Sequence, residues 1–427
     1  MPRAHIVVGL GFGDEGKGSM VDALVRKTGA QLVVRYNGGA QAGHTVVLPD
    51  GRSHSFSQFG AGTFVPGCRT LLSRFMILHP TAALEEEEHL RSQGIADAFE
   101  RLDIDGHALV ITPYHQALNR LRELARGSER HGSCGMGIGE TVQDSIEHPH
   151  ERIYAYDLAN HALVTKKLKA IRKRKLQEAF ALRVKSTELA ILEDDDSLIE
   201  IIANRFAALA ERVTIGEWHS LPSDSDVVFE GAQGVLLDEN YGFHPYTTWS
   251  TCTSANALQL LRELDFQGER SVMGVLRGYS TRHGPGPFVA EDRDLSLPDI
   301  TNHWHPYQRN FRVGWFDLVA ARYALAADGN IDHLALTCLD RIEPSLIVTS
   351  YTIRGDRVNE LMVVPHDLDY QARLTDDLMQ AVPCLGEIDQ VSKPAQPYYY
   401  ARVLQKLLRK EVRVLSLGPT HQDKRWL

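Results

Sequence analysis

A glycine-rich turn with three charged side chains stands near the start of the chain. Residues 9–18 read Gly-Leu-Gly-Phe-Gly-Asp-Glu-Gly-Lys-Gly. Three of these glycines match the dinucleotide pattern GxGxxG, in which backbone amides bind a pyrophosphate. The turn also matches the start of a P-loop, GxxxxGK, ending in Lys17, but Gly18 stands where that motif has Ser or Thr. The turn therefore indicates a phosphate-binding site of one of two kinds.

Two features favour a triphosphate site over a dinucleotide site. A dinucleotide fold needs an acidic residue about 20 positions on, at the end of the second strand, to bind ribose hydroxyls. That strand ends here in Arg35-Tyr36-Asn37, without a carboxylate. Lys17 supplies an ammonium group that can bridge phosphate oxygens. Asp14 offers a carboxylate oxygen for Mg²⁺ in place of the missing hydroxyl. An NAD-dependent dehydrogenase is the weaker alternative.

Other loops carry groups suited to ligand binding. Segment 37–45 is rich in glycine and ends in His44-Thr45, and the His44 imidazole titrates near neutral pH. Gln233 follows another apolar run, and its amide could read the edge of a nucleotide base. Similar polar or glycine-rich turns are 132–139, 230–234 and 279–286.

Short apolar runs alternate with amphipathic stretches and position these turns. This alternation predicts an α/β fold with a central, largely parallel sheet flanked by helices, in which loops at the carboxyl ends of the strands bind ligands. Segments 345–353 and 360–364 are expected to form an antiparallel edge. The predicted strands are His5–Gly9, Gln31–Tyr36, Ala108–Thr112, Val227–Glu230, Ser271–Arg277, His333–Leu339 and Val412–Leu417, and the predicted helices are Pro80–Gln93, His115–Arg126, Asp157–Leu192, Phe316–Ala327 and Pro397–Lys410.

Composition limits the partners. The chain has 427 residues and a net charge of −9, so it has no global attraction for nucleic acid or anionic lipid. The basic run Lys166–Lys175 could contact nucleic acid, but without interleaved aromatic residues it is typical of a solvated helix face. Five scattered cysteines and no CxxC pair indicate a reducing compartment. We expect a cytoplasmic protein with no signal peptide and no membrane span.

Motifs along nearly the whole chain, in the correct order, resemble the adenylosuccinate synthetase family. The family pattern GDEGKG stands at 13–18 and FEGAQG at 229–234. Divergent matches are Gln41–Thr45 for NxGHT, His131–Glu140 for HGTTGRGIGP, Pro245–Thr248 for PYVT, Gly278–Phe288 for AYSTRVGAGPFP, Val313–Asp317 for TGWLD, Thr337–Asp340 for TKLD and Ser416–Pro419 for STGP.

The resemblance implies a single domain, 1–427, with a P-loop-NTPase-like fold. It implies a C–N ligase that uses GTP and Mg²⁺ to join IMP to L-aspartate, and a homodimer. In that chemistry Asp14 removes the N1 proton of the 6-oxopurine, and O6 attacks the γ-phosphate of GTP while Lys17 and His44 stabilise the transferring group. The amine of aspartate then displaces the phosphate from C6.

The resemblance also implies a role for each matching residue. The catalytic residues are Asp14, Lys17, His44 and Gln233. The nucleotide site is Asp14, Gln41, Ser133, Gln233, Thr248 and Arg309; the GTP site is Gly13, Glu15, Gly16, Lys17, Gly18, Gly43, His44, Thr45, Cys338, Asp340, Ser416 and Gly418; the amino-acid site is Arg309 and Arg312; and the metal ligands are Asp14 and the Gly43 carbonyl.

Several positions depart from the family pattern. Cys338 stands where the guanine-reading element has Lys, so ATP is possible as the phosphate donor. The arginine that the family sends across its dimer interface has no match in 147–151, and Arg152 is the nearest candidate. The amino-acid loop TTGRxRRTGW reads His305–Trp315 here and has lost both threonines.

These departures leave the second substrate open. Losing a charged hydrogen bond to a carboxylate costs about 1.5–3 kcal/mol. Either the loop is rebuilt around aspartate, using His303, His305 or Tyr307, or the chain is a paralogue that joins another amine or acts on a modified purine nucleotide. A nucleotide-binding regulator without catalysis is a further alternative, but it would not need Asp14, Lys17 and His44 together.

Overall fold

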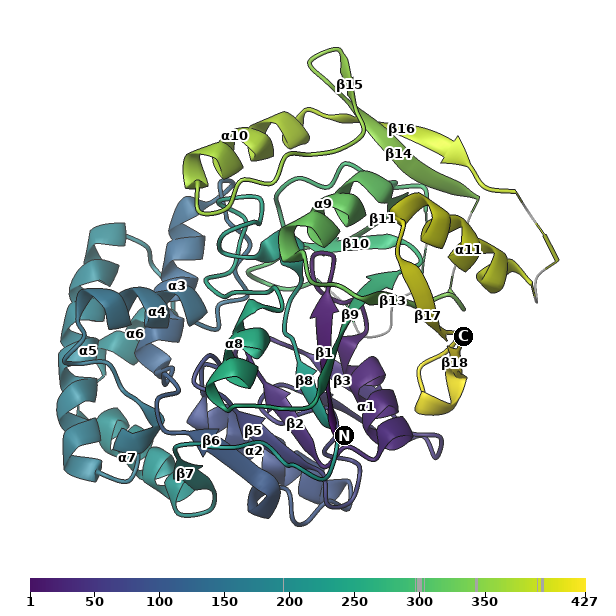
Figure 1. The fold of residues 1–427 in the computed structure, drawn as a ribbon. Coiled ribbons are helices and arrows are strands. Elements are labelled where there is room, and N and C mark those ends of the chain that lie inside the picture. Colours follow the sequence, from purple (N-terminus) through teal and green to yellow (C-terminus); the bar gives the residue numbers. More distant parts are fainter. Residues whose placement is uncertain are drawn as a thin grey trace.

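A ten-stranded sheet forms the centre of the molecule (Figure 1). The computed structural model describes residues 1–194, 196–295, 297, 302, 304–341, 345–389, 391–392 and 395–427. All neighbouring strands of the sheet are parallel except β17 and β18, which confirms the expected α/β class. In sheet order the strands are β18 (Lys424–Trp426), β17 (Glu411–Ser416), β13 (His333–Thr337), β9 (Glu269–Arg277), β1 (Arg3–Gly9), β8 (Val227–Glu230), β2 (Leu32–Arg35), β5 (Arg69–Leu72), β6 (Leu102–Asp105) and β7 (Thr214–Gly216).

Helices cover both faces of this sheet because its strands are apolar on both sides. In β1, for example, Val7 packs into one core while Ile6 and Val8 pack into the other. Side chains of a strand alternate between faces, so one buried strand serves two layers. The first core holds residues of α1 (Lys17–Thr28), α2 (Pro80–Ser92), α3 (Pro113–Arg126), α5 (His161–Leu182) and α7 (Asp196–Ala210), and the second holds residues of α8 (Ala255–Glu263), α9 (Leu318–Asp328), α10 (Leu368–Met379) and α11 (Gln396–Leu408).

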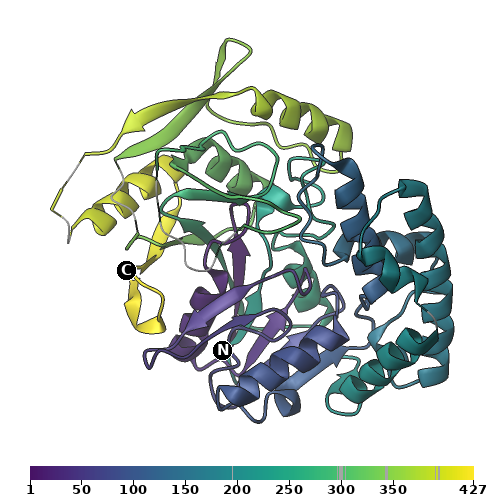
Figure 2. The same ribbon diagram turned by 180° about the vertical axis from the view of Figure 1, so that it is seen from behind.

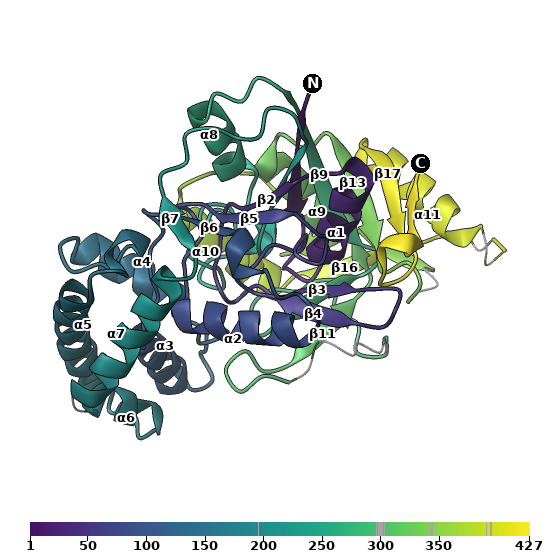
Figure 3. The same cartoon turned by 90° about the horizontal axis from the view of Figure 1, so that it is seen from below.

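The two ends of the sheet carry different structures. Helices α3, α4 (Ile138–Glu147), α5, α6 (Glu188–Glu193) and α7 gather at one end, in blue and teal in Figures 1 and 2. The C-terminal elements α11, β17 and β18 lie at the opposite end (Figure 3).

Smaller pieces of sheet surround this centre. Two antiparallel strand pairs are β3 (His44–Val47) with β4 (Ser53–Phe56), and β10 (Ser280–His283) with β11 (Phe311–Gly314), whose strands are joined by the long segment 284–310. A four-stranded sheet contains β12 (Phe316–Asp317), β14 (Leu346–Ile353), β15 (Asp356–Val358) and β16 (Val382–Glu387).

Four of the expected elements differ from the structure. The expected helix 157–192 is interrupted after α5, where Arg183 takes a left-handed φ of 54°. Residues 360–364 are not a strand, because the two-residue turn Arg354-Gly355 pairs β15 directly with β14. The expected strand 108–112 forms only isolated bridges, at Leu109 and Val110. The helix expected from Phe316 begins two residues later, because 316–317 form the short strand β12.

The basic run on α5 is largely neutralised by acidic neighbours. Lys167 pairs with Asp157, Lys169 and Arg172 with Asp196, and Arg174 and Lys175 with Asp144. This supports the interpretation as a helix face over the nucleic-acid alternative. Among the helices of the described residues, none is both long and apolar enough to cross a bilayer.

Candidate functional site

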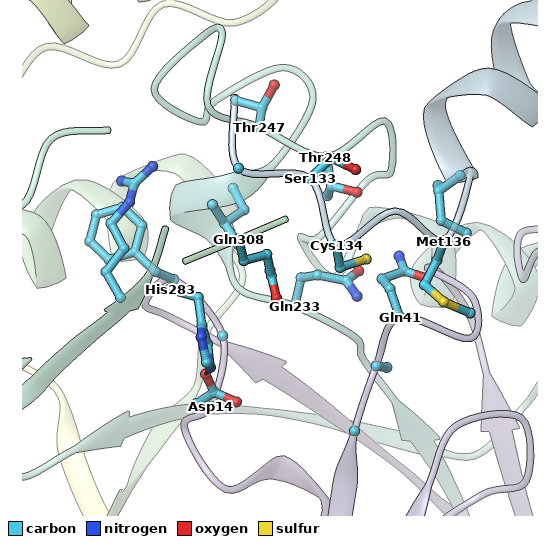
Figure 4. Close-up of a pocket in the computed structure, with 18 of the residues that line it drawn as sticks. Asp14, Gln41, Ser133, Cys134, Met136, Gln233, Thr247, Thr248, His283 and Gln308 are labelled. Carbon is cyan, nitrogen blue, oxygen red and sulfur yellow. Dashed lines mark ion pairs between the residues drawn. The ribbon is translucent and has the colours of Figure 1, made fainter. Parts of the chain in front are cut away.

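A cavity of about 1030 Å³ opens where the central strands end at their carboxyl side. Its lining begins with residues that follow β1 and ends with residues that follow β17. Parallel strands bring their following loops to one edge of the sheet, so segments far apart in sequence converge here. Figure 4 shows part of this lining. Of the predicted site residues the cavity is lined by Gly13, Asp14, Gly16, Lys17, Gly18, Gln41, Gly43, His44, Thr45, Ser133, Gln233, Thr248, Cys338, Asp340, Ser416 and Gly418.

Glu15 organises the glycine-rich turn from inside. Its carboxylate accepts hydrogen bonds from the amides of Gly11 and Gly13, both at 2.9 Å, and from Lys17 Nζ at 2.6 Å. Only 2% of Glu15 is exposed, and it does not line the cavity. Its arrangement therefore fits a residue that shapes the turn rather than one that touches a nucleotide.

The missing P-loop hydroxyl has a steric explanation. A Cβ at Gly18 would lie 2.7 Å from His44 Cβ and 2.9 Å from the His44 carbonyl carbon. The hairpin strand β3 thus packs directly on the first turn of α1, and only glycine fits there. The close approach places the His44 imidazole beside Lys17 in the cavity lining.

His44 is held by a carboxylate that the sequence did not single out. Its Nδ1 pairs with Glu230 at the end of β8, and the second Glu230 oxygen accepts the Ala61 amide at 2.8 Å. Burial lowers the pKa of His44, against the opposing effect of Glu230. With one ring nitrogen fixed to Glu230, the ring orientation is set.

Asp14 lies at the mouth of the turn in a left-handed conformation, with φ of 60°. Its Oδ2 is 3.2 Å from His283 Nε2, and Arg277 donates to its backbone carbonyl. Burial would raise the pKa of Asp14, but the hydrogen bond with His283 and the charges of His283, Arg277 and Lys17 lower it overall. Asp14 is therefore a carboxylate at neutral pH, able to accept a proton.

Amide and hydroxyl groups face the cavity opposite this turn (Figure 4). Both side-chain polar atoms of Gln41, and Gln233 Oε1, are buried without a hydrogen-bond partner among the described residues. Ser133 Oγ donates to Asn119 at 2.8 Å. Buried amides without partners are rare in folded proteins, so those of Gln41 and Gln233 point to a ligand that supplies the missing bonds.

A second cluster lies at Ser416 and Gly418, which line the cavity. Ser416 Oγ and Lys424 Nζ both donate to the Gly418 carbonyl, at 3.1 and 2.9 Å. Burial lowers the pKa of Lys424 to about 8, although nearby acidic groups, Asp340 among them, oppose the shift. A lysine from β18 thus lies behind the segment in which Cys338 replaces the lysine of the family pattern.

The predicted amino-acid ligands do not line the cavity. Arg312 donates to Glu291 Oε2 at 3.1 Å and to the Gly286 carbonyl at 2.9 Å. Arg309 lies over the Trp304 ring at 6.0 Å. Gln308, from the same loop, does line the cavity. The roles of both arginines stay predictions, and His303 lies outside the described residues.

Two other candidates for the amino-acid site, His305 and Tyr307, and the candidate interface arginine, Arg152, also lie outside the cavity lining. Tyr307 donates to Glu188 at 2.9 Å, and His305 Nδ1 accepts the amides of Tyr307 and Gln308. Arg152 lies over the Tyr154 ring at 4.8 Å and does not line the cavity.

Sequence reasoning missed Glu230, His283 and Gln308. Glu230 had one usable signal: a charged residue that closes an apolar strand predicted to be buried needs a partner. His283 and Gln308 had none of this kind, since their place beside Asp14 and Gln233 depends on how the β10–β11 strand pair packs.

Comparison with known proteins agrees with the motifs. The family model described as adenylosuccinate synthetase matches residues 6–425. An adenylosuccinate synthetase of Chlorobium chlorochromatii is 32% identical over 442 residues, covering 99% of this chain and 97% of the relative. One of Mycobacterium avium is 30% identical over 432 residues, covering 98% and 97%.

Two solved structures share the fold. Fully ligated adenylosuccinate synthetase of Plasmodium falciparum superposes with a TM-score of 0.76 at 19% identity, over 99% of both chains. Succinoaminodeoxyadenylate synthetase of cyanophage S-2L, bound to dGMP and dATP, superposes with a TM-score of 0.58 at 17% identity, over 100% of this chain and 95% of that one. The whole-length family match and the curated relatives show that this chain belongs to the adenylosuccinate synthetase family, whose members are C–N ligases.

Proposed function

We propose that the protein joins IMP to L-aspartate with GTP as the phosphate donor and forms adenylosuccinate. Family membership supports this reaction. The observation that carries it is the convergence of Asp14, Lys17 and His44 on one cavity, together with the amides of Gln41 and Gln233. A regulator without catalysis would have no need of an ionised carboxylate beside the phosphate-binding turn.

The reaction has two steps at the purine. The Asp14 carboxylate accepts the N1 proton of IMP, and the negative charge moves to O6. O6 attacks the γ-phosphorus of GTP, the bond to the β-γ bridging oxygen breaks, and GDP leaves. Lys17 and His44 stabilise the charge spread over the transferring group. The amine of aspartate then attacks C6, loses a proton, and inorganic phosphate departs with O6.

Mg²⁺ fits the groups beside the turn. The donors are the Asp14 carboxylate and the Gly43 carbonyl, and oxygen atoms are the ligands Mg²⁺ prefers. Gly43 faces open space, with no heavy atom within 4 Å of a would-be Cβ, so the backbone there can be approached. A bound Mg²⁺ would offset the negative charge of the phosphates.

Binding roles follow the same assignment. We assign the nucleotide to Gln41, Ser133, Gln233, Thr248 and Arg309. GTP is assigned to the glycine-rich turn, Gly43–Thr45, Cys338, Asp340, Ser416 and Gly418, with Glu15 acting through the turn. We assign the aspartate carboxylates to Arg309 and Arg312, which requires their loop to turn toward the cavity when substrate binds.

The proposal extends to the setting of the enzyme. Like its relatives it would act in purine nucleotide biosynthesis. We propose a cytoplasmic homodimer, with small-molecule substrates and no nucleic-acid partner. The net charge of −9 and the paired basic run on α5 support the last point.

An assay of phosphate release tests the proposal. Phosphate should be released only when GTP, IMP, L-aspartate and Mg²⁺ are all present, with adenylosuccinate identified by mass. Parallel reactions should replace GTP by ATP, IMP by other 6-oxopurine nucleotides, and aspartate by each other amino acid. Turnover with another amine but none with aspartate would overturn the assignment of the second substrate, and phosphate release without IMP would overturn the mechanism.

A further inference from the structure

We propose that His283 is a positioning residue that orients the Asp14 carboxylate toward the purine. This inference rests on the proposed function, in which Asp14 accepts the N1 proton. The two side chains come from distant segments, the glycine-rich turn and strand β10, and lie side by side in Figure 4. His283 Nε2 is 3.2 Å from Asp14 Oδ2, within reach of an N–H donor.

Asp14 needs such a partner because little else holds its side chain. The residue stands in a left-handed turn, and 29% of the side chain is exposed. Arg277 donates to the backbone carbonyl of Asp14, and the charges of Arg277 and Lys17 act on the carboxylate electrostatically. In the part of the chain that the structure describes, no other side chain is recorded at hydrogen-bond distance from the carboxylate. Without His283 the carboxylate could rotate about χ1 and χ2 at little cost.

His283 itself is firmly placed. It pairs with Phe311 across the β10–β11 strand pair, and the two rings pack with centroids 4.8 Å apart. Nε2 also lies 3.0 Å from Asn302 Oδ1. The single Nε2–H therefore lies between two acceptors, the Asn302 amide oxygen and the Asp14 carboxylate, and the Phe311 ring together with these two acceptors fixes its direction.

The geometry leaves Asp14 free to react. An ionised carboxylate has about four lone-pair positions, and His283 takes one of them. The remaining positions can face the purine N1–H and a cation. The family pattern AYSTRVGAGPFP has valine at the position that His283 occupies in this chain.

The test compares two substitutions at His283. His283→Val introduces the residue of the family pattern and removes the donor. Because misplacing a reacting group by about 1 Å can cost 100-fold in rate, we expect kcat to fall about 10- to 100-fold. KM for GTP should change by less than about threefold, since His283 is not assigned to the phosphates. His283→Gln keeps an N–H₂ close to the position of Nε2 and should restore most of kcat.

A matched control separates this effect from loss of stability. His5 forms a similar pair with Asp226, with Nε2 2.9 Å from Oδ2, but does not line the cavity. His5→Val should leave kcat within twofold of wild type. Wild-type kcat in His283→Val, or an equal loss in His283→Gln, would overturn the proposal.

A crystal structure of His283→Val tests the same point without any assay. We expect the Asp14 carboxylate to be turned away or split between conformers. A single Asp14 conformer identical to that of the wild-type protein would overturn the proposal. This readout stays valid if wild-type enzyme shows no turnover with IMP and aspartate, a result that would reject the proposed function alone.

Discussion

Two imidazole–carboxylate pairs hold reacting groups of the cavity, and in each the reacting group is held by a residue from another strand. His44 is oriented by Glu230, and Asp14 by His283. Both pairs give direction to a group that would otherwise rotate in an open cavity. Since proton and phosphoryl transfer depend on distance and alignment, these partners bear on rate more than on binding.

The first prediction concerns Asp14. Asp14→Ala should abolish turnover, because no base then faces N1 of the purine. The Asp14 side chain is 29% exposed in the cavity and belongs to neither hydrophobic core, so the urea midpoint should change little. Phosphate release and urea unfolding measure the two effects. Wild-type rates in this variant would refute the mechanism.

The second prediction concerns Glu230. Glu230→Gln removes the charge that orients His44 and places an N–H₂ group opposite His44 Nδ1 or the Ala61 amide. We expect a loss of about 1–3 kcal/mol of stability from the buried mismatch and a fall in kcat of about 10- to 100-fold. Both are measurable on one preparation.

Glu86 supplies the control for that variant. It is a buried glutamate paired with His54 at 3.3 Å, away from the cavity. Glu86→Gln should lose comparable stability and keep wild-type kcat. If Glu86→Gln lowers kcat as much as Glu230→Gln, the effect of Glu230 is structural only.

The site was predictable where chemistry and local sequence coincide. Asp14, Lys17 and His44 stand in or beside glycine-rich turns, so their types and spacing already indicated phosphate chemistry. Glu15 has the same setting, yet its side chain turns inward to bond Gly11 and Gly13. Local sequence does not record the direction of a side chain within a turn, nor does it pair Asp14 with a residue on a distant strand.

At the scale of elements, a buried ionic network joins three helices beside the cavity. Asp144 on α4 is 1% exposed and lies within 3.4 Å of His115 on α3 and within 2.8 Å of Arg174 and Lys175 on α5. Burial would raise the pKa of Asp144, but hydrogen bonds from His115 and Lys175 lower it below its usual value. The network therefore stabilises the fold above the unfolded pKa, near 4, and its contribution fades as pH falls.

The third prediction follows from this network. Asp144→Asn leaves Lys175 without its buried counter-ion and should cost about 3–5 kcal/mol, measured by urea unfolding at pH 7. Asp196→Asn, which breaks the exposed pairs of Asp196 on α7 with Lys169 and Arg172 on α5, should cost at most about 1 kcal/mol. Equal losses in the two variants would show that burial of the network does not matter.

Element boundaries were predictable to the extent that local rules decide them. The strands leading into the cavity follow apolar runs that end at glycine or polar residues, and they form as expected. The break after α5 was missed because Arg183 adopts its left-handed conformation with no glycine or proline to signal it. The edge of the small sheet was misplaced because the turn Arg354-Gly355 fixes the register of β15.

At the scale of the molecule, one sheet belongs to two cores and one cavity. In strand β1, Val7 packs in the first core while Ile6 and Val8 pack in the second. The loop that follows β1 lines the cavity. If either helix layer unfolded, one face of the sheet would be exposed to water, and the other helix layer packs against the same strands. The chain should therefore unfold as one cooperative unit, in line with the single domain expected from the sequence.

The fourth prediction is a single unfolding transition. Trp426 packs against the first core and Trp315 against the second, so comparing the fluorescence of wild type with that of Trp426→Phe and Trp315→Phe reports on each layer. Both signals and circular dichroism should give one urea midpoint.

Ligand binding extends this test. A ligand at about 100 times its Kd adds about 2.7 kcal/mol to the free energy of unfolding. GTP and IMP should therefore raise the urea midpoints reported by both tryptophans by the same amount. The loops assigned to these ligands extend from strands that are covered by both helix layers. Two midpoints, or a shift confined to one tryptophan, would show that the layers unfold separately and that the chain has two domains.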